Sequence, residues 1–482
     1  MRVSINASMR CCVLVSLIPV LVLPSAALAV PDILKDPLSA NPARLRKGAT
    51  LPDGSFIACP ASEDLSQPLE LDSAVDIALC NNPQIRSAWA AIKIQAGVLG
   101  EARAAYLPTM NVSINRLGNW TSTSFPPGAG ESFMKGNQLY GSLTWRLLDF
   151  GERRANTKAA SQLLAAALAA HDASLQKTMA GVIQAYFDAM TAQSQYISRK
   201  KMAEIAERVL AATKRREERG AAPLSDTLQA STALAKARLN ESRAQGEFNK
   251  SLGLLVQAMG LAPGTVLRLP QTLELYRVDD VRELNSWLRK AEEQHPAIRQ
   301  ARAKLAADKA KITVARAEGL PSLDATAYIS RNGYPNQGLS SDKQSVKSAG
   351  VTLNLPIFEG FGRTYKILGA KAQVEQSDAQ LQDTTNQVLT EVVKAHADAL
   401  TSLGTLRATD RLMEAATLGL RSSLRRYERH AADILEVLNS QSSLADAEQE
   451  RIRAVAEWRS ARLRLLANSG LLGLADLLQE RR

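Results

Sequence analysis

The spacing of apolar residues along the chain changes from a helical period to a strand period and back again. Residues 72 to 104 carry Ala, Ile and Leu three and four positions apart, which predicts a helix. Leu107-Pro108 predicts the end of that helix, because proline lacks a backbone donor and restricts the residue before it. Strict alternation follows at 110–115 and again at 139–145, and predicts two strands.

The same order of elements returns in the second half of the chain. Alternating stretches at 323–330 and 349–355 again predict a pair of strands. Asp149 matches Glu359, and Gly260 matches Gly470, at a constant offset of 210 residues. An offset this long and this constant indicates one duplicated unit of about 200 residues, and not a short-period solenoid.

The duplication divides the chain into successive parts. We place the two repeats at 69–261 and 283–472, joined by a linker at 262–282 that loses helical periodicity and contains two prolines. Residues 30–68 then form an N-terminal segment, and residues 473–482 form a C-terminal tail. Each repeat is expected to fold as one structural unit.

Very long helices follow each pair of strands. Residues 152 to 218 contain no proline and a single glycine, and predict a rod of about 100 Å at roughly 1.5 Å per residue. The pattern breaks at 219–223 and resumes to about Met259, which predicts a helical hairpin. A matching hairpin is predicted at 363–466, with its turn near His430. A lone rod of this length is unstable, so the helices are expected to pack as coiled coils in a bundle.

The predicted strands are apolar on one face and polar on the other. In the first strand Met110, Val112 and Ile114 oppose Asn111 and Ser113. Strands of about 9 to 11 residues with this alternation suit tilted strands that cross a bilayer, and the same alternation also suits a soluble sandwich. Four strands are too few to close a barrel, and open edges are not tolerated in lipid. If the strands cross a membrane, several chains must share one barrel.

The first 29 residues have the features of a secretory signal peptide. Arg2 and Arg10 precede an apolar run at 11–23, and small residues lead to a cleavage site after Ala29. An uncleaved anchor helix is the alternative. No later run reaches the roughly 18 apolar residues of a membrane-spanning helix. The mature chain is therefore expected to leave the cytoplasm.

Two cysteines, Cys59 and Cys80, remain after that cleavage. In an exported chain they predict one disulfide, which closes a loop of roughly 20 residues and contributes about 3 kcal/mol to stability. Two unrelated buried thiols are the alternative.

Charge and chemistry exclude several classes of function. The formal net charge is +11, and removing Arg2 and Arg10 leaves +9, but the basic residues are scattered along helical stretches. An exported chain rarely meets nucleic acid, so no nucleic-acid partner is expected. The four histidines fall in separate segments without metal-ligand spacing, and are His171, His295, His396 and His430. With no phosphate-binding glycine loop and no plausible Cys–His pair, we expect no enzyme, no cofactor and no metal site.

Short motifs recur in the same order in both copies. They are the Pro-containing helix motif at 82–86 and 295–299, the Leu-Pro strand entry, the strand exit that ends in Asp149 or Glu359, and the turn before 433–439. Taken together over roughly residues 69 to 472, these motifs resemble the TolC-like outer-membrane efflux and secretion proteins of Gram-negative bacteria. The stretch 71–91, with Cys59 upstream, looks closest to the CyaE branch of that family.

The resemblance implies an α+β membrane protein that works as a homotrimer. Three chains with four strands each make a 12-stranded transmembrane β-barrel in the outer membrane, continued by a periplasmic α-helical barrel of coiled coils. Such channels are passive conduits that work with a periplasmic adaptor and an inner-membrane ABC transporter or RND pump. The CyaE-like stretch implies type I secretion of a repeat-rich protein toxin such as adenylate-cyclase haemolysin. Small-molecule efflux is one alternative, and a non-channel periplasmic coiled-coil adaptor is another.

The same resemblance implies a gate at the periplasmic helix tips. Six residues beyond each turn, the matching acids are Asp226 in the first copy and Glu436 in the second. Tyr427 matches a tyrosine that links to the first of these acids. Tyr427 and Asp226 are therefore the candidate latch, and Glu436 is the candidate acid of the constriction.

The chain departs from the family pattern at two gate positions. Asn439 stands where the family has a further acid, and Ala432 stands where it has a basic latch residue. Arg219 and Arg429 are the candidate replacements for that basic residue. The alternative is a solvated helix tip with incidental charges.

Overall fold

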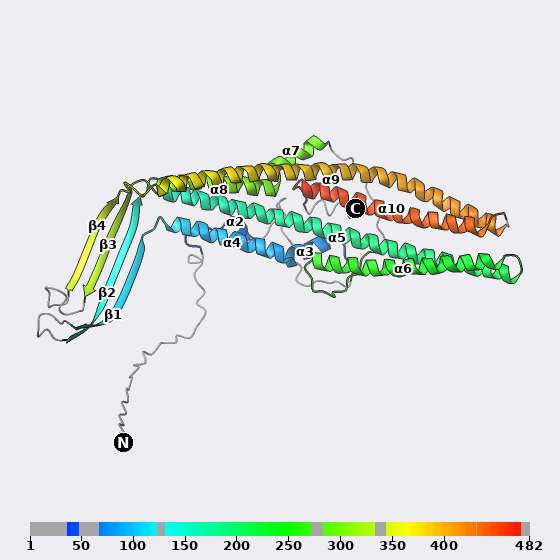
Figure 1. Ribbon diagram of the computed structural model, residues 1–482, viewed down its shortest axis with the longest axis horizontal. Coiled ribbons are helices and arrows are strands. Elements are labelled where there is room, and N and C mark those ends of the chain that lie inside the picture. Colours follow the sequence, from blue (N-terminus) through cyan, green and yellow to red (C-terminus); the bar gives the residue numbers. More distant parts are fainter. Residues whose placement is uncertain are drawn as a thin grey trace, which may run out of the picture.

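The computed structural model describes residues 36–47, 67–122, 131–270, 283–332, 344–429 and 431–473. They form an elongated molecule with a β-sheet at one end and long helices running away from it (Figure 1). The predicted signal peptide with its cleavage site at Ala29, part of the linker, most of the C-terminal tail, Cys59 and His430 lie outside the described residues. Within the described ranges, no helix is long and apolar enough to cross a membrane.

Among the described residues, each half of the chain contributes four matching helices. In the first half they are α3 (Leu71–Asn81), α4 (Pro83–Ala104), α5 (Glu152–Glu218) and α6 (Leu224–Ala258). In the second half they are α7 (Leu284–Gln294), α8 (Pro296–Ala317), α9 (Gly362–Glu428) and α10 (Ile434–Asn468). The lengths are identical in the two halves, at 11, 22, 67 and 35 residues. The predicted duplication is therefore confirmed.

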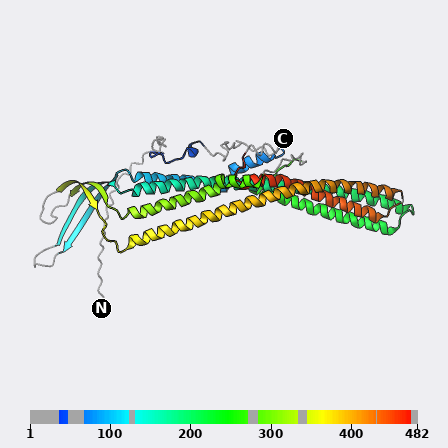
Figure 2. The same cartoon turned by 90° about the horizontal axis from the view of Figure 1, so that it is seen from above.

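The two long helical hairpins turn where the sequence predicted. α5 ends at Glu218, and Gly220 has a φ of +66° in the turn to α6. A side chain is strained in that conformation, which explains the glycine. The helices α5, α6, α9 and α10 all run along the long axis of the molecule (Figure 2). Because α10 contacts α5 as well as α9, the two hairpins pack against each other.

One stretch predicted as a single helix, residues 72 to 104, forms two helices. The break lies at Asn82, between α3 and α4. The Asn82 side chain accepts a hydrogen bond from the backbone N–H of Gln84 at 2.8 Å and so caps α4. Pro83 fits the first position of α4, because the backbone N–H that it lacks would have no partner in the helix. The predicted continuous helix is therefore wrong at this point.

His295 takes the place of Asn82 at the start of α8. Its Nδ1 accepts a hydrogen bond from the backbone N–H of Ala297 at 3.2 Å, which requires a neutral imidazole. Burial lowers the pKa of His295 below its ordinary value of 6.5. The environment of the ring therefore favours the form that caps the helix.

A four-stranded antiparallel sheet lies at one end of the helices. Its strands are β1 (Thr109–Ser122), β2 (Glu131–Leu148), β3 (Ser322–Asn332) and β4 (Gln344–Asn354), paired in the order β1-β2-β3-β4. Leu143 pairs with Met110 of β1 and with Ala327 of β3, so apolar positions of neighbouring strands share one face. Met110 and Ile114 on that face are exposed in the single chain. The alternation predicted from the sequence is confirmed, and its apolar side is exposed in the single chain.

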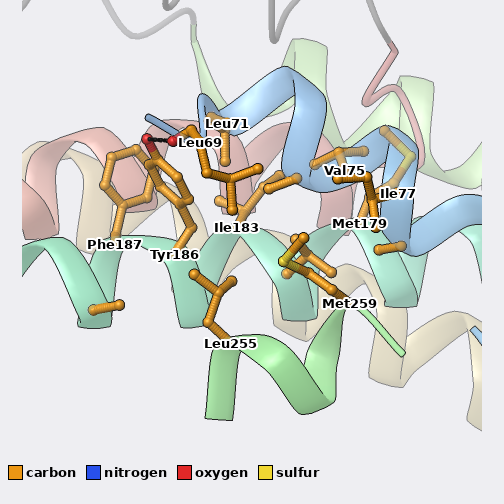
Figure 3. Packing of buried hydrophobic residues seen from close by; sticks show 14 of the residues in the cluster. Leu69, Leu71, Val75, Ile77, Met179, Ile183, Tyr186, Phe187, Leu255 and Met259 are labelled. Atoms are coloured by element: carbon orange, nitrogen blue, oxygen red, sulfur yellow. Dashed lines mark hydrogen bonds between the residues drawn. The ribbon is translucent and has the colours of Figure 1, made fainter. Parts of the chain in front are cut away.

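The main apolar core lies midway along the helices, where α3 and the end of α6 pack on α5 (Figure 3). Its buried side chains include Leu71, Val75, Met179, Ile183 and Leu255. Tyr186 is buried in the same cluster, and its hydroxyl donates a hydrogen bond to the carbonyl of Leu69 at 3.0 Å. Burial raises the pKa of Tyr186 to about 12, so this phenol stays neutral.

The N-terminal segment is attached to the outside of α4 and α5. The short helix α2 (Ala43–Lys47) places Arg44 in an ion pair with Asp172 of α5. Arg103 of α4 donates a hydrogen bond to the carbonyl of Ser39 at 2.6 Å. Cys80 in α3 is disulfide-bonded, whereas Cys59 lies outside the described residues. The pairing of these two cysteines therefore stays a prediction.

Candidate gate at the tips of the helical hairpins

The turns of the two hairpins lie close together at the end of the molecule farthest from the sheet (Figures 1 and 2). A cluster of buried apolar side chains joins the hairpins just before these turns. It contains Met202 and Val209 of α5, Leu420 and Tyr427 of α9, and Ile434, Val437 and Leu444 of α10. The first hairpin is thus fixed to the second by a shared core close to its tip.

One arginine of the first hairpin contacts the predicted latch tyrosine. Arg216, in the last turn of α5, donates a hydrogen bond from Nη1 to the backbone carbonyl of Tyr427 at 3.1 Å. Its guanidinium carbon also lies 4.3 Å from the centre of the buried Tyr427 ring. A cation–π contact of this kind contributes about 0.5–2 kcal/mol, depending on its exposure. Arg216 and Tyr427 therefore link the tips of the two hairpins.

Further polar links follow along α10. The Gln441 side chain donates a hydrogen bond from Nε2 to the carbonyl of Met202 at 3.4 Å, within the buried interface. The Ser198 hydroxyl of α5 donates to the carboxylate of Glu448 at 2.5 Å. These bonds hold α10 against α5 over several helical turns above the tip.

Glu436, the predicted acid of the constriction, is paired within its own hairpin. Arg426 of α9 donates from Nη1 to its carboxylate at 2.8 Å, and from Nη2 to the carbonyl of Ala431 at 3.2 Å. Both side chains are largely exposed, so the ion pair contributes at most about 1 kcal/mol. Arg426 therefore pairs with Glu436 within one hairpin and stabilises the turn between α9 and α10.

Tyr427 and Asp226 do not meet within one chain. The Tyr427 hydroxyl is buried and has no hydrogen-bond partner among the described residues. The half-buried Asp226 carboxylate lies 3.5 Å from the Ser225 hydroxyl. The latch between Tyr427 and Asp226 is not formed in the single chain and stays a prediction for the assembled protein.

Three other predicted gate residues lie on the surface of the tips. Arg219, Arg429 and Asn439 are all exposed. Two arginines that the motifs did not single out, Arg216 and Arg426, contact Tyr427 and Glu436 instead. These two arginines are 210 residues apart and so hold equivalent positions in the repeats. A comparison of the two repeats at the last turn of each long helix would have shown this matched pair.

A polar groove lies between the hairpins farther from the tips. It has a volume of about 490 Å³ and is lined by α5, α9 and α10. Asp188 and Asp398, equivalent positions in the two repeats, both line it, together with Arg453 and Arg464 of α10. Burial raises the pKa of Asp188, although Gln184 donates a hydrogen bond to its carboxylate at 2.8 Å. The described residues contain no cluster of metal-ligating side chains.

Known proteins share this sequence and fold. The family model of the outer membrane efflux protein matches residues 74–261 and 287–471. The chain is 36% identical to Protein CyaE of Bordetella pertussis over 444 residues, which are 92% of this chain and 92% of that protein. It is 24% identical to outer membrane protein TolC of Vibrio cholerae over 407 residues, or 83% and 90% of the two proteins.

A solved structure agrees with these matches. The outer membrane protein VceC of Vibrio cholerae has a TM-score of 0.71 to this chain at 20% identity, covering 83% of this chain and 96% of that one. The matches confirm the predicted outer-membrane location and the interpretation of the chain as a transport conduit and not an enzyme. Two copies of one α–α–β–β–α–α unit, with an apolar-faced sheet and paired helical hairpins, place the chain in the outer membrane efflux protein family.

Proposed function

We propose that the chain is the outer-membrane channel-tunnel of a tripartite export system and that three copies form the working channel. The observation that carries this proposal is the direct attachment of an apolar-faced sheet to two helical hairpins. The apolar face suits contact with lipid. At about 1.5 Å per residue, α5 and α9 are rods of about 100 Å that suit the wall of a periplasmic tunnel.

The strand order supports a barrel shared between chains. β1 and β4 form the two edges of the sheet, and an edge strand in lipid needs a partner for its backbone N–H and C=O groups. Three sheets joined with β4 of one chain beside β1 of the next give a closed barrel of 12 strands. The homotrimer therefore satisfies the backbone of every strand.

The exposure of equivalent residues supports the same ring of chains. Met202 of α5 is 4% exposed and Ile434 of α10 is 1% exposed, because these two helices pack on each other within the chain. Their equivalents, Leu412 of α9 and Leu224 of α6, are 48% and 59% exposed. If α9 of one chain packs on α6 of the next as α5 packs on α10, both leucines become covered. Three chains then give six similar hairpins around one axis.

The hairpin tips are the proposed gate of this tunnel. The Arg216–Tyr427 contact holds the two hairpins of one chain together. Asp226, Glu436 and Asn439 belong to the rim of the closed tip, with Arg219 and Arg429 available on its surface to pair with a neighbouring chain. Opening requires the tips to separate, so the links at Tyr427 resist it.

The proposed cargo is a repeat-rich protein toxin exported by type I secretion, such as adenylate-cyclase haemolysin. The identity of 36% to Protein CyaE, over nearly the whole of both chains, supports this class. The proposed partners are a periplasmic adaptor and an inner-membrane ABC transporter, and the proposed repeat limits are 69–261 and 283–472. Small-molecule efflux with an RND pump is the second candidate, favoured by the description of the family as efflux proteins.

The export function is tested in a Gram-negative host that lacks its own channel of this family. The full chain is expressed with the adaptor and ABC transporter of a type I system, and toxin in the medium is measured together with resistance to small toxic compounds. We expect toxin secretion and heat-resistant trimers in the outer-membrane fraction. Restored resistance without secretion supports efflux instead, and monomers in the soluble periplasm contradict the channel.

A further inference from the structure

Four basic residues lie at the end of the sheet farthest from the helices, one on each strand. They are Arg116 of β1, Lys135 of β2, Arg331 of β3 and Lys347 of β4. All four are exposed. The strands contain two acidic residues, Asp324 towards the helices and Glu131 at the first position of β2, beyond these cations. We call the four residues the basic belt.

The strand register places the whole basic belt on the apolar face. Arg331 pairs with Leu139, and Lys347 pairs with Ile329, which is two positions from Arg331 and therefore on its face. Arg116 lies on that face too, because it is two residues after Ile114, and Ile114 pairs with Leu139. Lys135 also lies there, because it pairs with Gly118, which is two residues after Arg116. The four cations thus occupy successive rows on the outward, apolar side of the sheet.

The spacing along β3 relates the basic belt to the apolar band. Leu323, Ala325, Ala327 and Ile329 precede Arg331 on the same face. The eight steps from Leu323 to Arg331 span about 26 Å along the strand, which is about 20 Å of height at the usual strand tilt of about 40°. The apolar band of outer-membrane proteins is about 25 Å tall. Arg331 therefore lies near the upper edge of the apolar band, and Lys347 lies one row nearer the helices, beside Ile329.

The next row of the sheet is aromatic. Trp120 pairs with Phe133, and their rings stack with centroids 4.4 Å apart. An aromatic row on the apolar face is typical of the boundary between acyl chains and headgroups, so the basic belt lies just on the acyl side of this boundary. Long arginine and lysine side chains reach the headgroups from such a position. At the helix end of the sheet, by contrast, Arg146 is paired with Asp324 at 3.1 Å. The basic belt is thus the surface of the sheet where exposed cations meet a lipid headgroup layer.

We propose that the basic belt binds the phosphate groups of lipid A, the glycolipid of the outer leaflet. This proposal rests on the proposed function, in which the far end of the sheet faces the cell exterior. Lipid A carries its phosphates on a disaccharide directly above its acyl chains, at the level that the basic belt occupies. One cation on each strand, repeated around three chains, presents positive charge to this anionic layer on every side of the barrel.

The test uses purified full-length trimer in neutral detergent and three probes: bisphosphorylated lipid A, the same glycolipid without phosphates, and phosphatidylglycerol. We expect the parent to bind bisphosphorylated lipid A at least about tenfold more tightly than either other probe, because each cation near an anionic headgroup changes affinity by about fivefold. Replacing the basic belt by Arg116→Gln, Lys135→Gln, Arg331→Gln and Lys347→Gln should remove that preference. High salt should weaken the binding as well.

A matched variant and a rescue variant keep the test decisive. Lys93→Gln, Lys236→Gln, Lys304→Gln and Lys371→Gln make the same charge change on exposed positions of the periplasmic helices and should leave binding unchanged. Arg116→Lys with Arg331→Lys retains the charge and should retain binding. Equal affinity of the parent for all three probes, or full binding by the four-glutamine belt variant, would overturn the proposal. Toxin secretion and trimer recovery from the outer membrane, measured on the same variants, report separately on the proposed function.

Discussion

At the scale of single residues, equivalent positions in the two repeats make different contacts. Arg426 pairs with Glu436 inside its own hairpin, whereas its equivalent Arg216 reaches across to Tyr427 of the other hairpin. Asn82 and His295 likewise occupy one position with different chemistry, since the asparagine cap does not titrate and the histidine cap does. The two repeats therefore share one backbone fold but differ in side-chain contacts. At equivalent positions, one arginine stabilises its own hairpin and the other links the two hairpins.

The first prediction concerns the gate. Tyr427→Phe with Asp226→Ala should raise single-channel conductance in planar bilayers, because it removes the proposed latch of the assembled tip. Each such polar link contributes only about 0.5–1.5 kcal/mol, but threefold symmetry multiplies the effect. Arg216→Ala should raise conductance further by removing the contact to the Tyr427 ring, and Glu436→Ala should weaken cation preference and block by divalent cations. Parental conductance and selectivity in all of these variants would refute the gate assignment without refuting the channel.

A second prediction concerns the histidine cap of α8. The folded pKa of His295 lies below that of the unfolded chain, so the unfolded chain binds more protons in acid. The stabilisation by the cap, about 1 kcal/mol, is therefore present above about pH 6.5 and is lost as the pH falls through the folded pKa. Hydrogen-exchange protection in the first turn of α8 should decrease between pH 7.5 and pH 5 in the parent.

The two caps supply reciprocal controls for this prediction. His295→Asn should keep the first turn of α8 protected at both pH values, because an asparagine cap carries no proton to gain. Asn82→His should introduce the same pH dependence at the start of α4. Protection of α8 that is unchanged by pH in the parent would show that His295 does not act as a titratable cap.

At the scale of elements, the helix and strand limits that depend on local chemistry were predictable, and contacts between elements were not. The end of α5 follows from Gly220 and Pro223, the end of α9 follows from its match to the first repeat, and both lie within about one residue of prediction. The break at Asn82 was missed because apolar spacing continues across it, although Asn-Pro is itself a helix-start signal. The Arg216–Tyr427 contact depends on how two hairpins pack, which periodicity within either hairpin does not specify.

The third prediction concerns the segment before α3. Cys59 and Cys80 are predicted to form a disulfide that attaches the N-terminal segment to the start of the first repeat. Peptide mass spectrometry of the mature protein without reducing agent should find the two cysteines linked. Recovery of two free thiols would rule the link out.

The fourth prediction concerns the orientation of the strands. The loops predicted at 118–138 and 331–347 include strand residues, because β1 continues to Ser122, β2 begins at Glu131, β3 continues to Asn332 and β4 begins at Gln344. The connections at 123–130 and 333–343 should face the cell exterior, because outer-membrane proteins place their longer loops there. A cysteine introduced at Ser124, which lies outside the described residues, should react with an impermeant reagent in intact cells. A cysteine at Ser231 of α6 should react only after outer-membrane lysis, and the reverse pattern would invert the topology.

At the scale of the whole molecule, the single chain exposes strand edges and apolar side chains that an assembly of chains would cover. Its sheet has two edges and an apolar outer face, and α6 has few buried side chains along its length. α9 exposes apolar residues at positions whose equivalents in α5 are buried. The sheet edges and the exposed sides of α6 and α9 each match a surface that is already covered elsewhere in the same chain, so a rotated second copy supplies these missing contacts.

The fifth prediction follows from that match. Leu412→Glu with Leu224→Glu should convert trimers to monomers, because both side chains lie at the proposed contact between chains and not in the core. Helix content by circular dichroism should stay close to that of the parent. Met202→Glu is the matched control at the equivalent buried position, and should unfold the hairpin instead. Stable trimers in the double variant would exclude α6 and α9 as neighbours across the interface.

The identical lengths of the long helices fix one distance between the sheet and both hairpin tips. With 67 residues in both α5 and α9, the two hairpin tips of a chain reach the same depth, and the six tips of the proposed trimer would end in a level rim. If one hairpin alone lost two turns from each helix, every second tip around the ring would end about 10 Å short of its neighbours. A flat partner could then touch only every second tip. The width of the periplasm that this protein spans is therefore adjustable only by changing both repeats together.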